Sequence, residues 1–410
     1  MTSKHNCRLC GSNKLSPVLK LKSLPVSHAL RTNVSAPDPR FDLGLATCAK
    51  CGLLQVPDPV PAEMLYTDTD TYMTGFHKPR HFDDLITTAI AQQDPGSVID
   101  IGCNDGALME ALKRHGYSPI VGVEPNTAAA NESNKKGYQV YGDFLTPSLA
   151  KKLKKENSAF DAAYLRHVAE HVYDLDEFFT SIRTILRDDG LLIMELPQVE
   201  PGLARGNPSI LWEEHVSYLS EPLAAYLLEK FGFAILDKRH YAFGGGAIAF
   251  ISQKQRQVPK RLRPPKAELS LHLVREFKKK FGTYCADLAT CVQKAHKSGY
   301  QVAVYGAAPR SCIVAAACKI SGVIDLVIDD RADIQGRLMP GTERAIHPLT
   351  SVDANGPPML CLLGVGAENE FKVRARLSAH LGQQPLYISL FPPRDTLATI
   401  ARASKQISRP

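Results

Sequence analysis

The sequence predicts an α/β protein in which two units with parallel sheets follow a small cysteine-rich N-terminal segment. Apolar, strand-like runs alternate with amphipathic stretches from about residue 86 to 253, and a second alternation begins at Val302. Strands that alternate with helices are typical of βαβ units. Two C-x-x-C pairs set the N-terminal segment apart. We therefore expect three domains: residues 1–85, 86–255 and 256–410.

The composition indicates an ordinary globular protein. Of its 410 residues, 44% are hydrophobic and 22% are charged. No apolar run approaches the ~18 residues that a membrane span needs, and the N-terminus lacks the apolar stretch of a secretory signal. We expect a cytoplasmic protein whose cysteines are thiols or metal ligands.

The net charge of +7 comes largely from two basic runs, Lys254–Lys266 and Arg275–Lys280. A basic balance suits phosphate-bearing ligands. Aromatic residues are not interleaved with these charges, so we expect no nucleic-acid partner. A solvated linker and a charged helix face are the simplest interpretation of the two runs.

The N-terminal cysteines predict a zinc site. Cys7 and Cys10 form one pair, and Cys48 and Cys51 form another 37 residues later. Each pair places two thiolates on one turn, and two such turns supply the four ligands of a tetrahedral zinc ion. Because the protein fills all four positions, we expect structural rather than catalytic zinc.

The first α/β unit opens with a strand, a glycine turn and a helix in the segment Ser97–Leu112. Gly102 and Gly106 let the backbone approach a ligand closely. A second strand, Pro119–Pro125, contains Glu124, about 20 residues after the turn, where a carboxylate can bind ribose hydroxyls. The pattern predicts a nucleotide-binding site at this edge of the sheet.

The acidic character of the turn favours S-adenosylmethionine over a dinucleotide. Dinucleotide sites use G-x-G-x-x-G to bind a pyrophosphate at a helix N-terminus. Here Asp105 lies inside the turn and Asp100 directly precedes it. These carboxylates would repel a pyrophosphate but suit the cationic amino-acid end of S-adenosylmethionine. Further strands are expected near Tyr141–Phe144, where Asp143 and Phe144 could contact adenine, and at Phe160–His167.

The second α/β unit follows a linker, Gln255–Lys266, and a long amphipathic helix, Ala267–Lys297. Its first strand is predicted in the run Val302–Ala308. The later strands are predicted at Leu326–Asp330, Met359–Gly364 and Leu386–Leu390.

Seven motifs occur in one order along the chain: C-R-L-C-G, C-x-x-C-G-L-L-Q, V-I-D-I-G-C-N-D-G, G-V-E-P-N, H-V-A-E-H-V-Y-D, E-E-H-V-S-Y and G-R-L-M-P-G-T. Together they resemble the sugar C-methyltransferase family of antibiotic and surface-polysaccharide pathways. The resemblance covers nearly the whole chain. It implies a small zinc domain, a class I methyltransferase domain and a C-terminal Rossmann-like domain.

The resemblance also implies a reaction, which is methyl transfer to the carbon beside the keto group of a dTDP-linked 4-keto-deoxysugar. Carried over residue by residue, it implies His215, Glu214, Tyr72 and His171 as catalytic residues. His171 matches the His of the family's N-V-L-A-H pattern.

The expected ligand contacts fall into two sets. The cofactor-binding residues are expected to be Asp100, Gly102, Asn104, Asp105, Gly106, Glu124, Pro125, Asp143, Phe144 and His167. The substrate-binding residues are expected to be Trp212, Tyr218, Gly245 and Arg310.

The departures from the family lie on the acceptor side. The family's Y-H-E-H is Trp212-Glu213-Glu214-His215 here, and its H-G-G-S-L-R is Phe243–Ile248, without the His, Ser and Arg. Its glycine-lysine turn is replaced by Ala307–Arg310. Methylation of oxygen or nitrogen on a sugar or another small molecule therefore stays open, as does a non-catalytic binding scaffold.

The segment Ser209–Ser220 combines an aromatic residue, two carboxylates, an imidazole and a phenol. Carbon methylation needs a base to remove a proton beside the ketone and a donor that holds the enolate oxygen. We predict His215 as the base, Glu214 or Glu213 as the group that orients it, and Tyr72 as the donor. We expect a monomer that acts on a small molecule, with no nucleic-acid or membrane partner.

Overall fold

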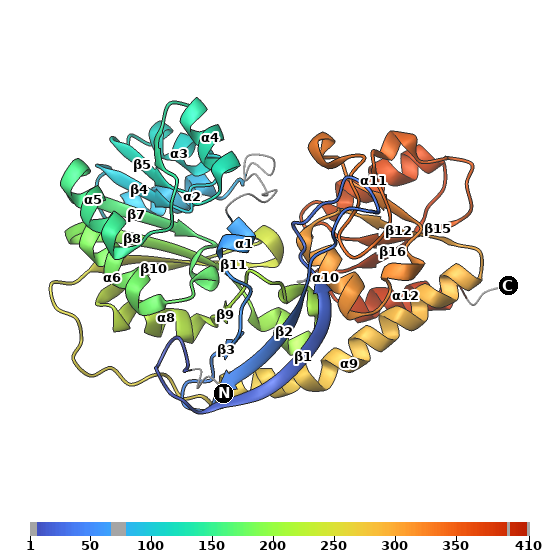
Figure 1. The fold of residues 1–410 in the computed structure, drawn as a ribbon, viewed down its shortest axis with the longest axis horizontal. Helices are drawn as coiled ribbons and strands as arrows, with labels where there is room; N and C mark the ends of the chain where they lie inside the picture. The colour runs from blue at the N-terminus through green and yellow to red at the C-terminus, as the bar shows by residue number, and fades with distance from the viewer. Residues whose placement is uncertain (1–5, 67–78, 392–393, 408–410) are drawn as a thin grey trace.

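The computed structural model describes residues 6–66, 79–391 and 394–407. Two α/β bodies lie side by side, and a strand pair from the N-terminal region runs beneath and between them (Figure 1). Tyr72, one of the expected catalytic residues, lies outside the described residues.

The N-terminal region forms a four-stranded sheet, of which one strand comes from far along the chain. The sheet order is β1-β2-β3-β9, and all its pairs are antiparallel. Its strands are β1 (Leu15–Pro25), β2 (Arg40–Cys48), β3 (Leu54–Gln55) and β9 (Ser217–Tyr218). Strand β9 belongs to the segment that carries His215, which lies beyond the boundary that we propose near residue 85. This sheet therefore contains strands from both sides of that boundary.

The central body has the seven-stranded order β10-β11-β8-β7-β4-β5-β6. Strand β11 runs antiparallel to both of its neighbours, and the other strands run parallel to one another. The strands are β4 (Val98–Ile101), β5 (Ile120–Val123), β6 (Gln139–Tyr141), β7 (Phe160–Arg166), β8 (Leu186–Pro197), β10 (Phe233–Tyr241) and β11 (Ala247–Lys254). The four predicted strands of this unit correspond to β4, β5, β6 and β7.

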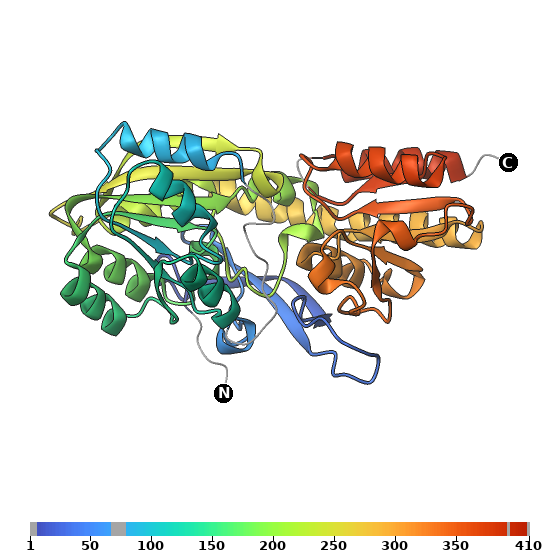
Figure 2. The same cartoon turned by 90° about the horizontal axis from the view of Figure 1, so that it is seen from above.

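Helices cover both faces of this sheet (Figure 2). They are α2 (Phe82–Ile90), α3 (Ala107–Arg114), α4 (Thr127–Lys135), α5 (Pro147–Asn157), α6 (Leu175–Ile185) and α8 (Glu221–Lys230). The shorter elements are α1 (Glu63–Tyr66), η2 (Ala169–His171), α7 (Glu200–Arg205), η3 (Pro208–Ile210) and η4 (Phe243–Gly245).

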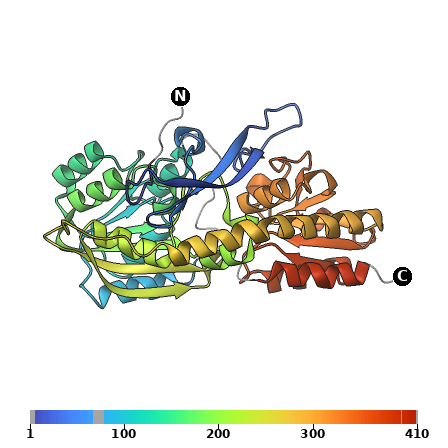
Figure 3. The ribbon, with the colours of Figure 1, turned by 90° about the horizontal axis from the view of Figure 1, so that it is seen from below.

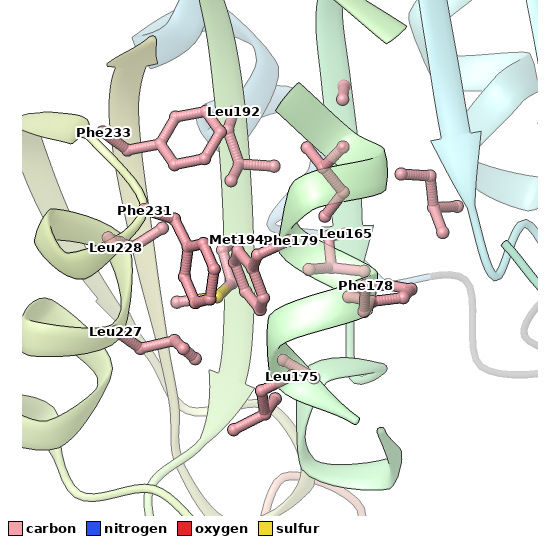
Figure 4. Close-up of a cluster of buried hydrophobic side chains, with 14 of the residues drawn as sticks. Leu165, Leu175, Phe178, Phe179, Leu192, Met194, Leu227, Leu228, Phe231 and Phe233 are labelled. Carbon is pink, nitrogen blue, oxygen red and sulfur yellow. The ribbon is translucent and has the colours of Figure 1, made fainter. Parts of the chain in front are cut away.

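One face of the sheet is sealed by aromatic packing between α6 and the segment that follows α8 (Figure 4). Phe179 and Phe231 are stacked with their ring centroids 5.2 Å apart. Met194 and Leu192 of β8 are fully buried beneath them. Burial of each such side chain contributes about 1.5–3 kcal/mol, so this face is a packed core.

The C-terminal body is a five-stranded parallel sheet of order β14-β13-β12-β15-β16. Its strands are β12 (Gln301–Tyr305), β13 (Leu326–Ile328), β14 (Ile346–His347), β15 (Met359–Leu363) and β16 (Leu386–Ser389). Its helices are α10 (Pro309–Ala317), α11 (Glu370–Leu381) and α12 (Thr396–Ile407), and its shorter turns are η5 (Ser321–Val323), η6 (Ala332–Ile334) and η7 (Leu349–Ser351). The predicted strands agree with β12, β13, β15 and β16.

Helix α9 (Glu268–Lys297) lies along both bodies (Figure 3). At 1.5 Å per residue, a helix of this length spans about 45 Å. Phe277 and Phe281 on α9 pack against the N-terminal sheet and α7, whereas Leu288 and Val292 pack in the C-terminal core. No helix among the described residues combines the length and apolarity that crossing a bilayer requires.

Candidate active site

The four N-terminal cysteines form a closed cluster. The Sγ atoms of Cys7 and Cys51 are 3.6 Å apart, as are those of Cys10 and Cys48. All four sulfurs lie within 4.8 Å of one another. A tetrahedral zinc ion with Zn–S bonds of about 2.3 Å would hold its sulfurs about 3.8 Å apart, so the cluster fits zinc without a free coordination position.

Arg8 joins this cluster to the segment that carries His215. Its guanidinium donates to the carbonyl oxygens of Val56 at 2.7 Å, Tyr173 at 3.2 Å and Val216 at 3.3 Å. Three carbonyls from three parts of the chain therefore converge on one side chain inside the first cysteine turn.

The turn after β4 requires glycine. Gly102 and Gly106 have φ angles of +73° and +76°, in the left-handed region that other residues rarely adopt. A Cβ atom on Gly102 would lie 2.4 Å from Cγ2 of Val168. The turn therefore brings bare backbone to the carboxyl edge of the sheet, where class I methyltransferases and other α/β folds bind their ligands.

Buried carboxylates surround this turn. Glu124 accepts hydrogen bonds from the amides of Asn104 at 2.9 Å and Asn126 at 2.8 Å. Asp100 is 2% exposed, and its Oδ2 has no hydrogen-bond partner among the described residues. Burial raises the pKa of both carboxyl groups to about 7. Asp105, also buried, accepts from the amide of Ala107 at the start of α3.

This set fits S-adenosylmethionine. Buried carboxylates favour a cationic guest and disfavour a pyrophosphate. Glu124 keeps lone pairs for ribose hydroxyls, and Pro125 follows it directly. At the same edge, after β6, Asp143 is exposed and accepts from the amide of Phe144, whose ring meets that of Tyr66 edge-on at 6.1 Å. When bound, S-adenosylmethionine supplies a methyl group on a positively charged sulfur.

A buried ionic network at the ends of β7 and β8 was missed in the sequence. Glu195 is fully buried and contacts Arg166 at 2.8 Å, His81 at 3.1 Å and His167 at 3.0 Å. His167, expected at the cofactor, has φ +51° and is held by this carboxylate. The signal was present, because Glu195 is the one charged residue in the otherwise apolar run Leu191–Pro197.

The segment Ser209–Ser220 packs against the N-terminal sheet. Its two carboxylates contact residues other than His215. Glu213 accepts from the amide and hydroxyl of Ser27, both at 2.6 Å. Glu214 is paired with His28 and with Nδ1 of His171 at 3.3 Å. Both carboxylates thus bond to groups other than His215 in this structure, and the orienting role at His215 stays a prediction. His28, on the loop after β1, is the positively charged partner of Glu214.

Glu214 and His28 form an ion pair in a buried environment. Burial alone would lower the pKa of His28, but the carboxylate of Glu214 outweighs it and raises that pKa to about 9. His28 is therefore charged at neutral pH.

His215 lies among rings and beside another carboxylate. Its ring centroid is 4.6 Å from Trp212, 5.0 Å from His171 and 6.3 Å from Tyr218. Burial lowers the pKa of His215 to about 3, so its imidazole is neutral. Donor atoms of Glu170, His171 and His215 all lie within 4.8 Å of one another. We call these three residues together with Glu214 the histidine centre.

Tyr66 connects the histidine centre to the cofactor edge. Its hydroxyl is 2.8 Å from Nδ1 of His171, and its carbonyl accepts from the side chain of Asn126 at 3.0 Å. Asn126 lies two residues after Glu124. Sequence analysis missed Tyr66 because the family pattern pointed to Tyr72.

The other expected substrate residues lie in two places. Tyr218 is buried on β9 opposite Leu54, and Gly245 ends η4. Arg310 at the start of α10 donates to the carbonyl oxygens of Ser209 at 2.9 Å and Gly244 at 2.7 Å, and its guanidinium covers Phe391 at 4.2 Å. Arg310 therefore clamps two loops of the central body to the C-terminal body.

Three family models match consecutive parts of the chain. A zinc binding domain matches residues 7–66, a methyltransferase domain matches 76–238, and a C-methyltransferase C-terminal domain matches 245–385. The three matches follow one another along the chain and are all to methyltransferase-associated domains. This C-methyltransferase homologue is therefore an S-adenosylmethionine-dependent methyltransferase with a zinc-binding N-terminal domain.

The chain is also similar to individual proteins. The C-methyltransferase NovU of Streptomyces niveus is 24% identical over 375 residues, which cover 87% of this chain and 89% of NovU. The mitochondrial ubiquinone biosynthesis O-methyltransferase of Bos taurus is 30% identical over 171 residues, 39% of this chain and 45% of that enzyme. The solved N-methyltransferase NodS from Bradyrhizobium japonicum WM9 matches 45% of this chain and 98% of its own, with 14% identity and a TM-score of 0.34.

Proposed function

We propose that this methyltransferase transfers a methyl group to the carbon beside a ketone in a nucleotide-linked sugar. The observation that carries the proposal is the double contact of Tyr66, whose carbonyl is bonded to Asn126 at the cofactor edge and whose hydroxyl is bonded to His171. This contact supports an acid–base centre within reach of the donor methyl group.

The reaction needs a proton acceptor and a group that holds developing negative charge. The proton leaves the carbon for the histidine centre around His215, the base that the sequence predicts, while the C–H electron pair becomes an enolate. The enolate carbon then bonds to the methyl group, and the electron pair of the broken C–S bond stays on sulfur. Trp212 and Tyr218 form apolar walls that exclude water from these steps.

A negatively charged acceptor is supported by a pocket of about 320 Å³ between the loop after β1 and the C-terminal body. Arg31, Arg40 and Arg344 line it together with Asp38 and Glu343. Arg31 follows His28 by three residues on the loop after β1. Guanidinium groups bind phosphates in two-pronged contacts, and we propose the diphosphate of the acceptor as their ligand. We also propose that the enzyme is a cytoplasmic monomer.

Proton exchange tests this function directly. The protein is incubated in D₂O with a 4-keto-deoxysugar nucleotide, and NMR follows deuterium at the carbons beside the ketone. We expect exchange without cofactor, and a carbon-bound methyl group in the product once S-adenosylmethionine is added. His215→Ala should lose both, whereas the exposed control His272→Ala should keep both.

A methyl group on oxygen or nitrogen would contradict carbon transfer and favour the O- or N-methyltransferase alternative. Cofactor binding without turnover on keto-sugar nucleotides, amines or alcohols would favour a scaffold.

A further inference from the structure

Glu170 is a buried carboxylate that makes no hydrogen bond of its own. Its side chain is 3% exposed, and neither oxygen has a hydrogen-bond partner among the described residues. The nearest nitrogens, Nδ1 of His167 and Nε2 of His171, lie 3.5 Å and 3.8 Å from its Oε1. Leaving a buried polar group without such a bond costs about 1–3 kcal/mol, and more for a charged one. The position therefore calls for a ligand.

The backbone fixes this carboxylate beside His215. The amide of Val216 donates to the carbonyl of Glu170 at 2.9 Å, which ties the segment of His215 to η2. Glu170 and His171 are adjacent on that short helix. Two separate parts of the chain thus bring one carboxylate and two imidazoles to one point.

The two ring nitrogens of His171 face different groups. Its Nδ1 faces the carboxylate of Glu214 at 3.3 Å and the hydroxyl of Tyr66 at 2.8 Å. Nδ1 is therefore the nitrogen held by Glu214 and Tyr66, and Nε2 is the nitrogen that faces Oε1 of Glu170, at 3.8 Å. Metal-binding histidines in proteins are oriented by this kind of outer carboxylate.

We infer that Glu170, His171 and His215 bind a divalent transition-metal cation. Two imidazole nitrogens and one carboxylate oxygen form a common open site for such ions. Their donor atoms lie within 4.8 Å of one another, and small side-chain rotations bring each to the ~2.1 Å bond length of these ligands. The protein supplies three ligands, so coordination positions stay open toward the acceptor.

The role of the cation rests on the proposed function. It holds the ketone oxygen as the C–H electron pair moves into the enolate. A water molecule on the cation would release one proton to solvent, and the resulting hydroxide would take the carbon-bound proton and become water again. His215 then acts as a ligand within the histidine centre, and the overall products do not change.

Cobalt titration tests the site in the full-length protein with zinc retained in its four-cysteine cluster. Cobalt in a nitrogen and oxygen site gives weak d–d absorption, whereas cobalt in a four-thiolate site adds intense charge-transfer bands. We expect one Co²⁺ per chain with d–d bands alone, and at least tenfold weaker binding in Glu170→Gln. The control Glu132→Gln, on a half-exposed side chain of α4, should bind as the wild type does.

His171→Asn is the second variant, in case Glu170→Gln unfolds, and it should weaken Co²⁺ binding to a similar degree. No d–d absorption, unchanged affinity in folded Glu170→Gln or His171→Asn, or charge-transfer bands alone would each overturn the inference.

Chelation separates this inference from the proposed function. If wild-type protein stripped of this second metal loses deuterium exchange and regains it with Co²⁺, both stand. If the stripped protein exchanges fully and His215→Ala does not, the proposed function stands and the cation inference fails. If Co²⁺ binds but no keto-sugar nucleotide shows deuterium exchange, the cation inference stands and the proposed function is contradicted.

Discussion

The side chains of Asp100 and Glu124 show how burial prepares a residue for a charged guest. Both carboxyl groups have pKa values raised to about 7, mainly by loss of solvent. In the free protein they hold protons that the unfolded chain has released, so they lower stability as the pH rises from about 4 to 7. A bound cationic S-adenosylmethionine offsets this cost because it favours the ionised form of the carboxyl groups around it.

We therefore predict that S-adenosylmethionine binds more tightly at pH 8 than at pH 6. Ionisation of one such group changes the affinity by up to about tenfold per pH unit below its pKa. Isothermal titration calorimetry across this range provides the measurement. Glu124→Gln should bind more weakly and with a flatter pH profile; an unchanged profile would mean that Glu124 does not titrate in this range.

Glu195 is another buried carboxylate, and its ionic partners determine how much it contributes to the stability of the fold. It is fully buried and neutralises Arg166 with help from His81 and His167. Glu195→Gln leaves a buried guanidinium without its counter-ion, a change that typically costs about 3–5 kcal/mol. Urea denaturation should show this loss, while Glu132→Gln should stay within about 0.5 kcal/mol of wild type. A small effect at Glu195 would indicate that Arg166 is hydrated.

At the scale of elements, the pairing of β3 with β9 matters most to function. Leu54 pairs with Tyr218, and the amide of Val56 donates to the carbonyl of Val216 at 3.0 Å. The zinc cluster holds the start of this sheet through Arg8. The segment Ser209–Ser220 is therefore supported by the turns that carry the four cysteines.

We predict that Cys48→Ser lowers zinc from about one ion per chain to near zero and also lowers methyl transfer. Metal analysis and turnover of the same preparation provide the two readouts, with S-adenosylmethionine affinity as the reference for the central body. Cys361→Ser, in the core of the C-terminal body, is the matched control and should retain zinc. Full zinc content in Cys48→Ser would contradict a four-cysteine ligand set.

Local patterns predicted most elements because strand and helix periodicity are local properties. The strands β4, β5, β7, β12 and β15 follow from apolar runs, and α9 follows from its amphipathic period. Strand β9 could not be predicted in this way, since two residues carry no period and pair with a partner more than 160 positions away. The same limit explains the site, because Glu214, His28 and Tyr66 meet only through tertiary packing.

The family motifs indicated only some of the residues that meet at the histidine centre. They pointed to His171 and His215, which the fold brings together. They did not point to Glu170, where N-V-L-A-H has alanine, or to His28 on the loop after β1. Those positions follow from the contacts of the folded chain and not from spacing.

For the whole molecule, specific side-chain contacts join the two bodies. Arg310 holds Ser209 and Gly244 from the opposite body, and α9 runs along both. Loss of these hydrogen bonds frees the loops that lie beside the acceptor segment.

Arg310→Ala should raise KM for the acceptor by about tenfold, equal to ~1.4 kcal/mol, with little change in S-adenosylmethionine affinity. Steady-state kinetics and calorimetry separate the two effects. Arg402→Ala, on an exposed position of α12, should change neither. An equal loss of cofactor affinity would show that Arg310 supports the central body as a whole.

The late arrival of β9 also has a consequence for biosynthesis. The four cysteines of the cluster have all been synthesised once translation reaches residue 51. The strand that completes their sheet, residues 217–218, is synthesised much later. Zinc capture on the nascent chain therefore precedes closure of the sheet by more than 160 residues of translation. A ribosome-stalled chain that ends near residue 200 should retain the metal yet leave the edge of β3 open to chaperones.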